Sequence, residues 1–199
     1  MKTQLKIALK AMFVSSIFSG LMLANIAQAA DVPAPNPAKT LLYISPAEYN
    51  YSVRLLHPYY DYWFTQGPIV APIAEAALKT KEADTQLCTA NETADEVIRI
   101  KPSLFYNPQM RVFHSKLVAT VYAGNGNQLA TYAGEGQQQG FMAVDHAITM
   151  HLNKAYQAAM DDLMTKLATR KVAPHQTAAT QYLPCGLIGA QAEPRISFY

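Results

Sequence analysis

Four stretches of the chain have the hydrophobic pattern of a β-strand, either a short apolar run or an alternation of apolar and polar residues. In one of them Ile98 and Ile100 fall on one face while Arg99 and Lys101 fall on the other, which is typical of a half-buried strand. Two others flank Gly124-Asn-Gly-Asn127, where Asn-Gly favours the positive φ angles of a primed hairpin turn. The predicted strands cover residues 40–45, 96–101, 110–123 and 129–134.

Two helices are predicted from apolar residues that recur every three or four positions. The first begins at Ile69, is clear to Lys81 and is expected to run on to about Leu87. The second covers residues 142–170, with an apolar stripe of Val144, Ile148, Leu152, Ala155, Ala159, Leu163 and Leu167. The expected fold is therefore α+β, with a mixed or antiparallel sheet of about four strands and two helices packed on one face.

The amino-terminal segment has the pattern of a cleavable secretory signal peptide. Three lysines precede an uncharged stretch from Ala11 to Ala30, and Ala27-Gln-Ala29 is a small-x-small sequence that a signal peptidase accepts. We predict cleavage after Ala29 and a periplasmic or secreted mature protein. The alternative is an uncleaved anchor, since about 20 uncharged residues could just span a bilayer. Ala30 stands where a lipoprotein would carry cysteine, so lipid anchoring is not expected.

Four segments are expected along the chain. A leader with three prolines separates the signal peptide from a single α/β domain, and a tail rich in Ala, Gln, Thr and Pro follows the last helix. The tail is predicted to lie extended over the surface, and its end at 195–199 could add an edge strand. The boundaries are 1–29 for the signal peptide, 30–39 for the leader, 40–171 for the domain and 172–199 for the tail.

Charge argues against nucleic acid as a partner. The whole chain has 16 Lys and Arg against 14 Asp and Glu, and removing Lys2, Lys6 and Lys10 with the signal peptide leaves 13 against 14. The mature protein is thus nearly neutral, and no stretch of it carries the dense basic run that tracks a phosphate backbone. Any association with a membrane is expected to be indirect.

Two cysteines, Cys88 and Cys185, belong to a chain that is predicted to enter an oxidising compartment. We expect them to form a disulfide that ties the tail to the domain. Two separate buried thiols are the alternative.

The patterns of common catalytic and metal sites are missing. Residues 134–140 are rich in glycine but match neither a P-loop nor a dinucleotide fingerprint, and they are interpreted as a flexible lead-in to the last helix. His146 and His151 lie five positions apart on that helix, about 140° around its axis, which does not suit a zinc pair. Ser115 follows His114, but adjacent strand residues point to opposite faces. No catalytic residue, metal or cofactor is expected.

The stretch from Tyr49 to Phe64 carries most of the functional promise. It contains seven aromatic residues, and Tyr and Trp are common at partner-binding surfaces because they combine a large apolar area with a polar group. About half of these side chains are expected to fill the core. The predicted partner-binding residues are Tyr59, Tyr60, Tyr62 and Trp63.

The order of elements resembles a recurrent bacterial envelope domain. The resemblance rests on a strand that opens with Ala94-Asp-Glu-Val-Ile-Arg-Ile100, on the Gly-Asn-Gly-Asn turn, and on the helical sequence Ala155-Tyr-Gln-Ala-Ala-Met-Asp-Asp-Leu163. It covers residues 40–171 and extends to auxiliary components of intermembrane ABC-type lipid transport, outer-membrane activators of penicillin-binding proteins and the TolB amino-terminal domain. The resemblance implies docking on other envelope proteins. Most members are lipoproteins, from which this chain differs in Ala30, its cysteine pair and its tail.

These observations favour a non-enzymatic periplasmic accessory or adaptor protein. It is expected to bind an envelope protein or a cell-wall polymer through residues 49–64 and a sheet edge; its oligomeric state is left undetermined. Two alternatives stay open. One is a small secreted cell-wall hydrolase that uses His114 and Glu135, and the other is a carrier of a lipid-like ligand held between helix and sheet.

Overall fold

A computed structural model describes residues 38–57, 61–142, 145–170 and 182–191. The predicted signal peptide, the leader up to residue 37 and the possible edge strand at 195–199 lie outside the described residues. The elements are β1 (Ala38–Tyr43), α1 (Pro46–Tyr49), β2 (Ser52–Leu56), β3 (Asp61–Thr65), α2 (Gly67–Lys79), β4 (Thr85–Leu87), β5 (Ala94–Asn107), β6 (Val112–Ala123), β7 (Gln128–Gln139), α3 (Asp145–Leu167) and α4 (Cys185–Gln191).

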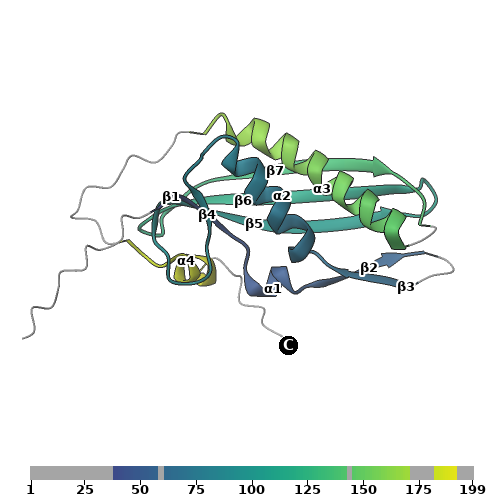
Figure 1. The fold of residues 1–199 in the computed structure, drawn as a ribbon, viewed down its shortest axis with the longest axis horizontal. Coiled ribbons are helices and arrows are strands. Elements are labelled where there is room, and N and C mark those ends of the chain that lie inside the picture. Colours follow the sequence, from purple (N-terminus) through teal and green to yellow (C-terminus); the bar gives the residue numbers. More distant parts are fainter. Residues whose placement is uncertain (1–37, 58–60, 143–144, 171–181, 192–199) are drawn as a thin grey trace, which may run out of the picture. The chain divides into compact units, whose positions relative to one another are not determined.

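The main sheet is mixed and has the strand order β4-β1-β5-β6-β7. β1 runs parallel to both β4 and β5, while β5, β6 and β7 form an antiparallel meander. The two long helices, α2 and α3, lie across the same face of this sheet (Figure 1). The predicted α+β class and the packing of two helices on one face are confirmed. The strand count is not, because the sheet has five strands and β2 and β3 form a separate two-stranded hairpin.

The first long helix is shorter than predicted. α2 ends at Lys79, and the backbone N–H groups of Lys81 and Glu82 both bond to the Leu78 carbonyl as the chain turns. Residues 85–87 then form β4, parallel to β1, where the sequence analysis extended the helix to Leu87. A strand of three residues is too short to show a two-residue period in the sequence, so these residues were assigned to the preceding helix.

The aromatic stretch contains ordered structure, although the sequence pattern gave it none. After the single turn of α1, β2 and β3 pair antiparallel with Arg54 opposite Trp63 and Leu55 opposite Tyr62. One face of this hairpin packs against the core through Val53, Leu55, Tyr62 and Phe64.

The β6–β7 hairpin is confirmed, but its turn is of a different kind and β7 is longer. The type I′ primed turn that Asn-Gly favours needs a positive φ at both central residues. Here Gly126 has a positive φ of 88° but Asn125 does not, and the Ala123 N–H bonds to the Asn127 carbonyl. β7 continues to Gln139. The glycine-rich stretch interpreted as a flexible lead-in is therefore mostly strand.

Glycine in this strand allows close packing of a helix. A Cβ atom on Gly134 would lie 2.2 Å from the Ala159 carbonyl oxygen, and one on Gly136 would lie 2.4 Å from the Ala155 carbonyl oxygen. The backbone of α3 therefore rests directly on β7 at these two positions, where any side chain would hold it away.

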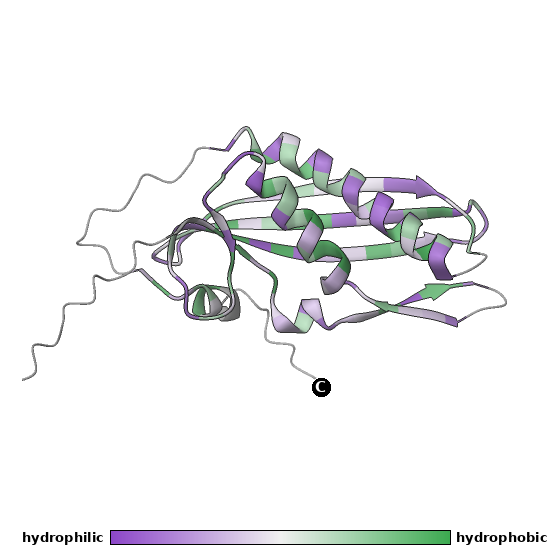
Figure 2. Ribbon diagram, viewed as in Figure 1, coloured by the Kyte–Doolittle hydropathy of each residue, from purple (hydrophilic) through white to green (hydrophobic). Residues whose placement is uncertain are grey.

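The main core lies between the helices and the sheet. Every predicted stripe residue of α3 that the structure describes, from Ile148 to Leu167, is buried, and Val144 lies outside the described residues. Tyr106, Phe113 and Tyr156 are the largest side chains in this core. In Figure 2 apolar and polar positions interleave along α3, as expected for a helix with one buried face. None of the helices in the described part of the chain has the length and apolar character needed to cross a bilayer.

A second, smaller core lies on the opposite side of the sheet, which we call the back face. Cys88 and Cys185 are joined in a disulfide, as predicted, with their Cα atoms 6.3 Å apart. The bridge holds α4 over one end of the back face, so this part of the tail is helical rather than extended. The residues of the cluster are Leu41, Tyr43, Cys88, Ala94, Val97, Tyr122, Cys185 and Ile188.

A buried ionic cluster fixes the end of α3. The Arg170 guanidinium, 8% exposed, bonds to Glu96 Oε1 through Nε over 2.9 Å and also to the Glu82 carboxylate. Thr40 donates its hydroxyl to the other oxygen of Glu82. The cluster joins α3, β1, β5 and the turn after α2, and so holds both helices at the β4 edge of the sheet.

Candidate functional site

A large cavity lies between the β2–β3 hairpin and β5, and we call it the hairpin groove. Its volume is about 800 Å³. One wall comes from β2 and β3, the other from β5, and α1 stands at one end. The lining residues are Ala47, Glu48, Tyr51, Ser52, Val53, Arg54, Leu56, Trp63, Gln66, Lys101, Pro102, Ser103 and Leu104.

Three large apolar side chains in the groove are exposed to solvent. Tyr51, Leu56 and Trp63 are 59%, 57% and 58% exposed. They gather around a concave surface, whereas single exposed apolar residues are normal on any protein. Such a grouping is a physical sign of a binding surface.

Trp63 is held in place by its strand partner. The Arg54 guanidinium lies 5.9 Å from the centre of the Trp63 ring and its Nε donates to Asp61 Oδ1 over 2.8 Å. A cation over an indole face is favourable by about 0.5–1 kcal/mol at an exposed site. The charge of Arg54 is thus balanced within the hairpin, and the indole remains the apolar feature that a partner would meet.

Among the predicted partner-binding residues, Trp63 lies in the groove with an exposed side chain. Tyr62 is half-buried on the other face of β3 and packs against the main core. Tyr59 and Tyr60 lie outside the described residues. Tyr51 and Leu56 lie within the predicted stretch 49–64 but were not among the predicted partner-binding residues. Ser52-Val-Arg-Leu55 alternates between polar and apolar residues over only four positions, and Asp61-Tyr-Trp-Phe-Thr65 does not alternate, so no hairpin pattern stood out.

Polar contacts anchor the end of the groove at which α1 lies. Ser45 caps α1 by accepting the Glu48 N–H over 3.3 Å, and the Glu48 carboxylate lies 3.5 Å from Lys101 Nζ on β5. Gln66 is buried and accepts a hydrogen bond from the Tyr156 hydroxyl over 2.7 Å. Burial raises the pKa of Tyr156 far above its ordinary value, so this phenol stays protonated and donates. These contacts connect the groove to α3 and β5.

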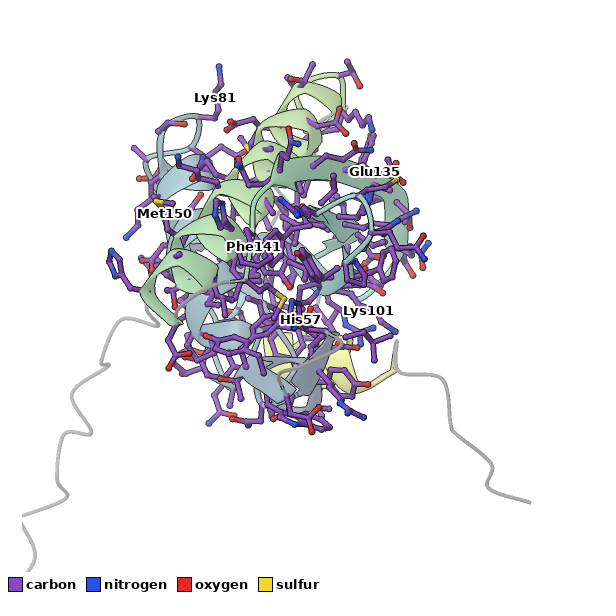
Figure 3. All side chains as sticks on the ribbon, turned by 90° about the vertical axis from the view of Figure 1, so that its right-hand side faces the viewer. His57, Lys81, Lys101, Glu135, Phe141 and Met150 are labelled. Atoms are coloured by element: carbon purple, nitrogen blue, oxygen red, sulfur yellow. A yellow bond between two sulfur atoms is a disulfide. The ribbon has the colours of Figure 1, made fainter. Side chains whose placement is uncertain are left out.

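A shallow depression on the back face adjoins the groove and shares Ser103 and Leu104 with it. Its volume is about 310 Å³, and Phe105, His114, Lys116, Glu135 and Gln137 line it. The Phe105 and His114 rings stack with centres 5.7 Å apart. In Figure 3 Lys101 and Glu135 emerge on the same side of the sheet, while Met150 lies on the helix side.

The depression does not have the arrangement of a hydrolytic site. Glu135 pairs with Lys116 over 3.0 Å and lies diagonal to His114, which stands opposite Gln137. It is the single carboxylate in the lining, whereas most glycosidases use two. Ser115 points to the other face, as predicted, where it is buried and donates to the Ala155 carbonyl over 2.7 Å.

Potential metal ligands do not form a free site in the described part of the chain. Cys88, Cys185 and Glu92 lie close together, but the two sulfurs are bonded to each other. His146 is exposed, while His151 is partly buried and stacks on Phe113 at 5.6 Å. Burial lowers the pKa of His151, with a smaller contribution from Lys154.

No protein-family model matches the sequence, and no curated protein matches it. Among solved structures, a DUF330 family protein from Xanthomonas campestris is similar, with 7% identity, TM-score 0.46, and coverage of 68% of this chain and 90% of that one. A predicted lipoprotein from Caulobacter crescentus has 18% identity, TM-score 0.31 and coverage of 52% and 84%. PelC from Paraburkholderia phytofirmans, a dodecamer, has 12% identity, TM-score 0.34 and coverage of 62% and 87%. At TM-scores this low no function is transferred.

Proposed function

We propose that this protein is a non-enzymatic accessory or adaptor protein of the bacterial cell envelope, exported by a signal peptide that ends at Ala29. It binds another envelope protein through the hairpin groove. The observation that carries the proposal is the gathering of Tyr51, Leu56 and Trp63, each more than half exposed, around a cavity of about 800 Å³. Aromatic side chains in such a setting supply much of the binding free energy at protein interfaces.

Placement of Trp63 on strand β3 supports a preformed surface. Because β2 and β3 are hydrogen-bonded and packed on the core, Trp63 is already ordered before a partner arrives. Less conformational entropy is then lost on binding than for the same residue on a loose loop. The sequence resemblance to envelope domains that dock on other proteins agrees with this function.

The test is photo-crosslinking in cells. Benzoylphenylalanine in place of Tyr51 or Trp63 should crosslink to one envelope protein, which mass spectrometry of the adduct identifies. The same amino acid in place of Met150, an exposed residue on α3, is the matched control and should not. Trp63→Ala should abolish co-purification of that protein while the thermal unfolding midpoint is kept. Equal crosslinking from all three positions would contradict the assignment.

The hydrolase alternative is disfavoured by the pairing of Glu135 with Lys116 and by the shallow back face. Zymography with purified peptidoglycan should show no clearing by the mature protein. A cleared band that disappears in Glu135→Gln would replace the adaptor function with an enzymatic one.

The lipid-carrier alternative is disfavoured by the packing between the helices and the sheet, where Leu42, Ile98, Leu117, Leu152 and Leu163 are fully buried. Native mass spectrometry of protein purified from an envelope extract should give the mass of the polypeptide alone. A bound mass in the range of a lipid would contradict this.

A further inference from the structure

We propose that the partner contributes an extended segment that adds a strand to the free edge of β5, inside the hairpin groove. This inference rests on the proposed function and specifies how the partner is bound. Its basis is a difference in strand length: β1 pairs with β5 only as far as Tyr43 and Arg99, but β5 continues to Asn107. Along 101–107, β6 is the sole strand partner within the described residues.

The direction of the backbone groups on β5 follows from two hydrogen bonds. The Gly124 N–H donates to the Asp95 carbonyl over 2.8 Å. The backbone N–H and C=O groups of the odd-numbered residues of β5 therefore point toward β6. The Gly140 N–H donates to the Arg111 carbonyl, which turns the odd-numbered residues of β6 toward β7 and agrees with this assignment. The β5–β6 register has no shift from Glu96 to Asn107. The backbone N–H and C=O groups of the even-numbered residues of β5 therefore point toward the free edge.

Three residues therefore form this edge: Pro102, Leu104 and Tyr106. Pro102 has no N–H, and strand prolines are found where the missing donor faces an edge. Leu104 and Tyr106 each direct both an N–H and a carbonyl away from β6. Their side chains are buried on the helix side, so the backbone is what they present at the edge.

The hairpin groove lies beside the Pro102–Leu104 part of this edge, and Tyr106 continues the edge beyond the lining residues. β2 approaches β5 without pairing with it, and the groove has Val53 and Leu56 on one wall and residues 101–104 on the other. A strand placed here would continue the line of β1. Figure 1 shows the hairpin lying beyond β5 on the side away from β6.

The chemistry of the groove selects the occupant. Backbone donors and acceptors that recur about every 7 Å match another extended polypeptide and do not match a sugar polymer. The charges of the groove are paired internally, Lys101 with Glu48 and Arg54 with Asp61. The segment is therefore expected to be uncharged, with apolar side chains at alternate positions that contact Trp63 and Leu56.

Amide hydrogen exchange followed by NMR tests the edge in the free protein. The N–H groups of Leu104 and Tyr106 should exchange at least 100-fold faster than those of Ser103 and Phe105, which are bonded to β6. Equal protection at all four positions would show that the edge is already covered and would overturn the inference. Protection of Leu104 and Tyr106 that rises with protein concentration would assign the edge to a second copy, which also overturns it.

A heptapeptide phage library, selected on the mature protein, supplies the probe for binding. Selected peptides should protect Leu104 and Tyr106, and N-methylation along the peptide should weaken binding more than 10-fold at every second position. Trp63→Ala should lose these peptides, while Gln137→Ala, on the back face outside the groove, should keep them. No enrichment, or binding that leaves both amides unprotected, overturns strand addition. The crosslinks from Tyr51 and Trp63 would still stand in that case, which separates the two proposals.

Discussion

Ser115 on β6 donates its hydroxyl hydrogen bond to the main-chain oxygen of Ala155 on α3, over 2.7 Å, through the space left by the side chain that Gly136 lacks. A side chain of the sheet thus forms a hydrogen bond directly with the backbone of α3. The main helix and the sheet are joined by polar contact here as well as by apolar packing.

Gly136→Val should move α3 away from β7. The new side chain begins 2.4 Å from the Ala155 carbonyl, a backbone atom that cannot move alone. We expect the free energy of unfolding to fall by about 2 kcal/mol or more, the range of overpacked cores. Urea unfolding followed by circular dichroism measures it. Gln137→Val, the next residue on the exposed face, is the control and should change stability by less than about 0.5 kcal/mol; equal values for the two variants would contradict the close packing.

Arg170→Met should destabilise the fold more than the loss of a surface cation. It leaves the buried carboxylate of Glu96 and the partly buried carboxylate of Glu82 without their guanidinium partner, and removing one member of a buried pair costs about 3–5 kcal/mol. Lys79→Met breaks the exposed pair with Glu75 and should cost less than about 0.5 kcal/mol. The free energies of unfolding in urea of both variants should differ accordingly. A small effect for Arg170→Met would show that the cluster is solvated.

Reduction of the disulfide should loosen α4 before it unfolds the sheet. The bridge closes a loop of 97 residues, and the chain-entropy model gives an upper value of about 4.7 kcal/mol for a loop of this size. Thermal unfolding with and without a phosphine reductant measures the loss. The double variant Cys88→Ser, Cys185→Ser should match the reduced protein and not respond to reductant. An unchanged midpoint in the native protein would contradict the stabilising role.

Acid should weaken the loop that receives α4. The hydroxyl of Thr89, together with the backbone N–H groups of Thr89 and Ala90, holds the pKa of Glu92 at about 2, below its ordinary value of 4.5. Because the folded pKa is the lower one, this stabilisation is complete above about pH 4.5 and is lost as the pH falls toward 2. Unfolding curves between pH 6 and 2 should therefore converge for the native protein and Glu92→Gln. Parallel curves would mean that Glu92 does not titrate in this loop.

Predictability from sequence varied with the number of residues that carried each pattern. The α3 stripe spans more than five turns, so its helix and its buried face could be predicted. β4 has three residues, and the hairpin strands have five each, too few to stand out from their flanking segments.

The sequence could predict which stretch carries the candidate site, but not the groove that this stretch forms with β5. Aromatic enrichment at 49–64 pointed to Trp63, but the groove also needs β5, which is distant in the sequence and reaches it only through the sheet topology. The same holds for Gly134 and Gly136. These positions need glycine because α3, which follows later in the chain, packs directly on them. From the local sequence alone they could only be described as flexible.

The single turn of α1 has a consequence for what can bind beside β5. Ala47 and Glu48 of α1 line one end of the hairpin groove, with Glu48 paired to Lys101, so in the proposed binding mode a polypeptide along the β5 edge would meet α1 there. A visiting chain must stop there or turn outward. The closed end would therefore limit the length of the bound segment as well as its side-chain pattern. A short terminal peptide or the arm of a loop would fit better than the middle of a long strand.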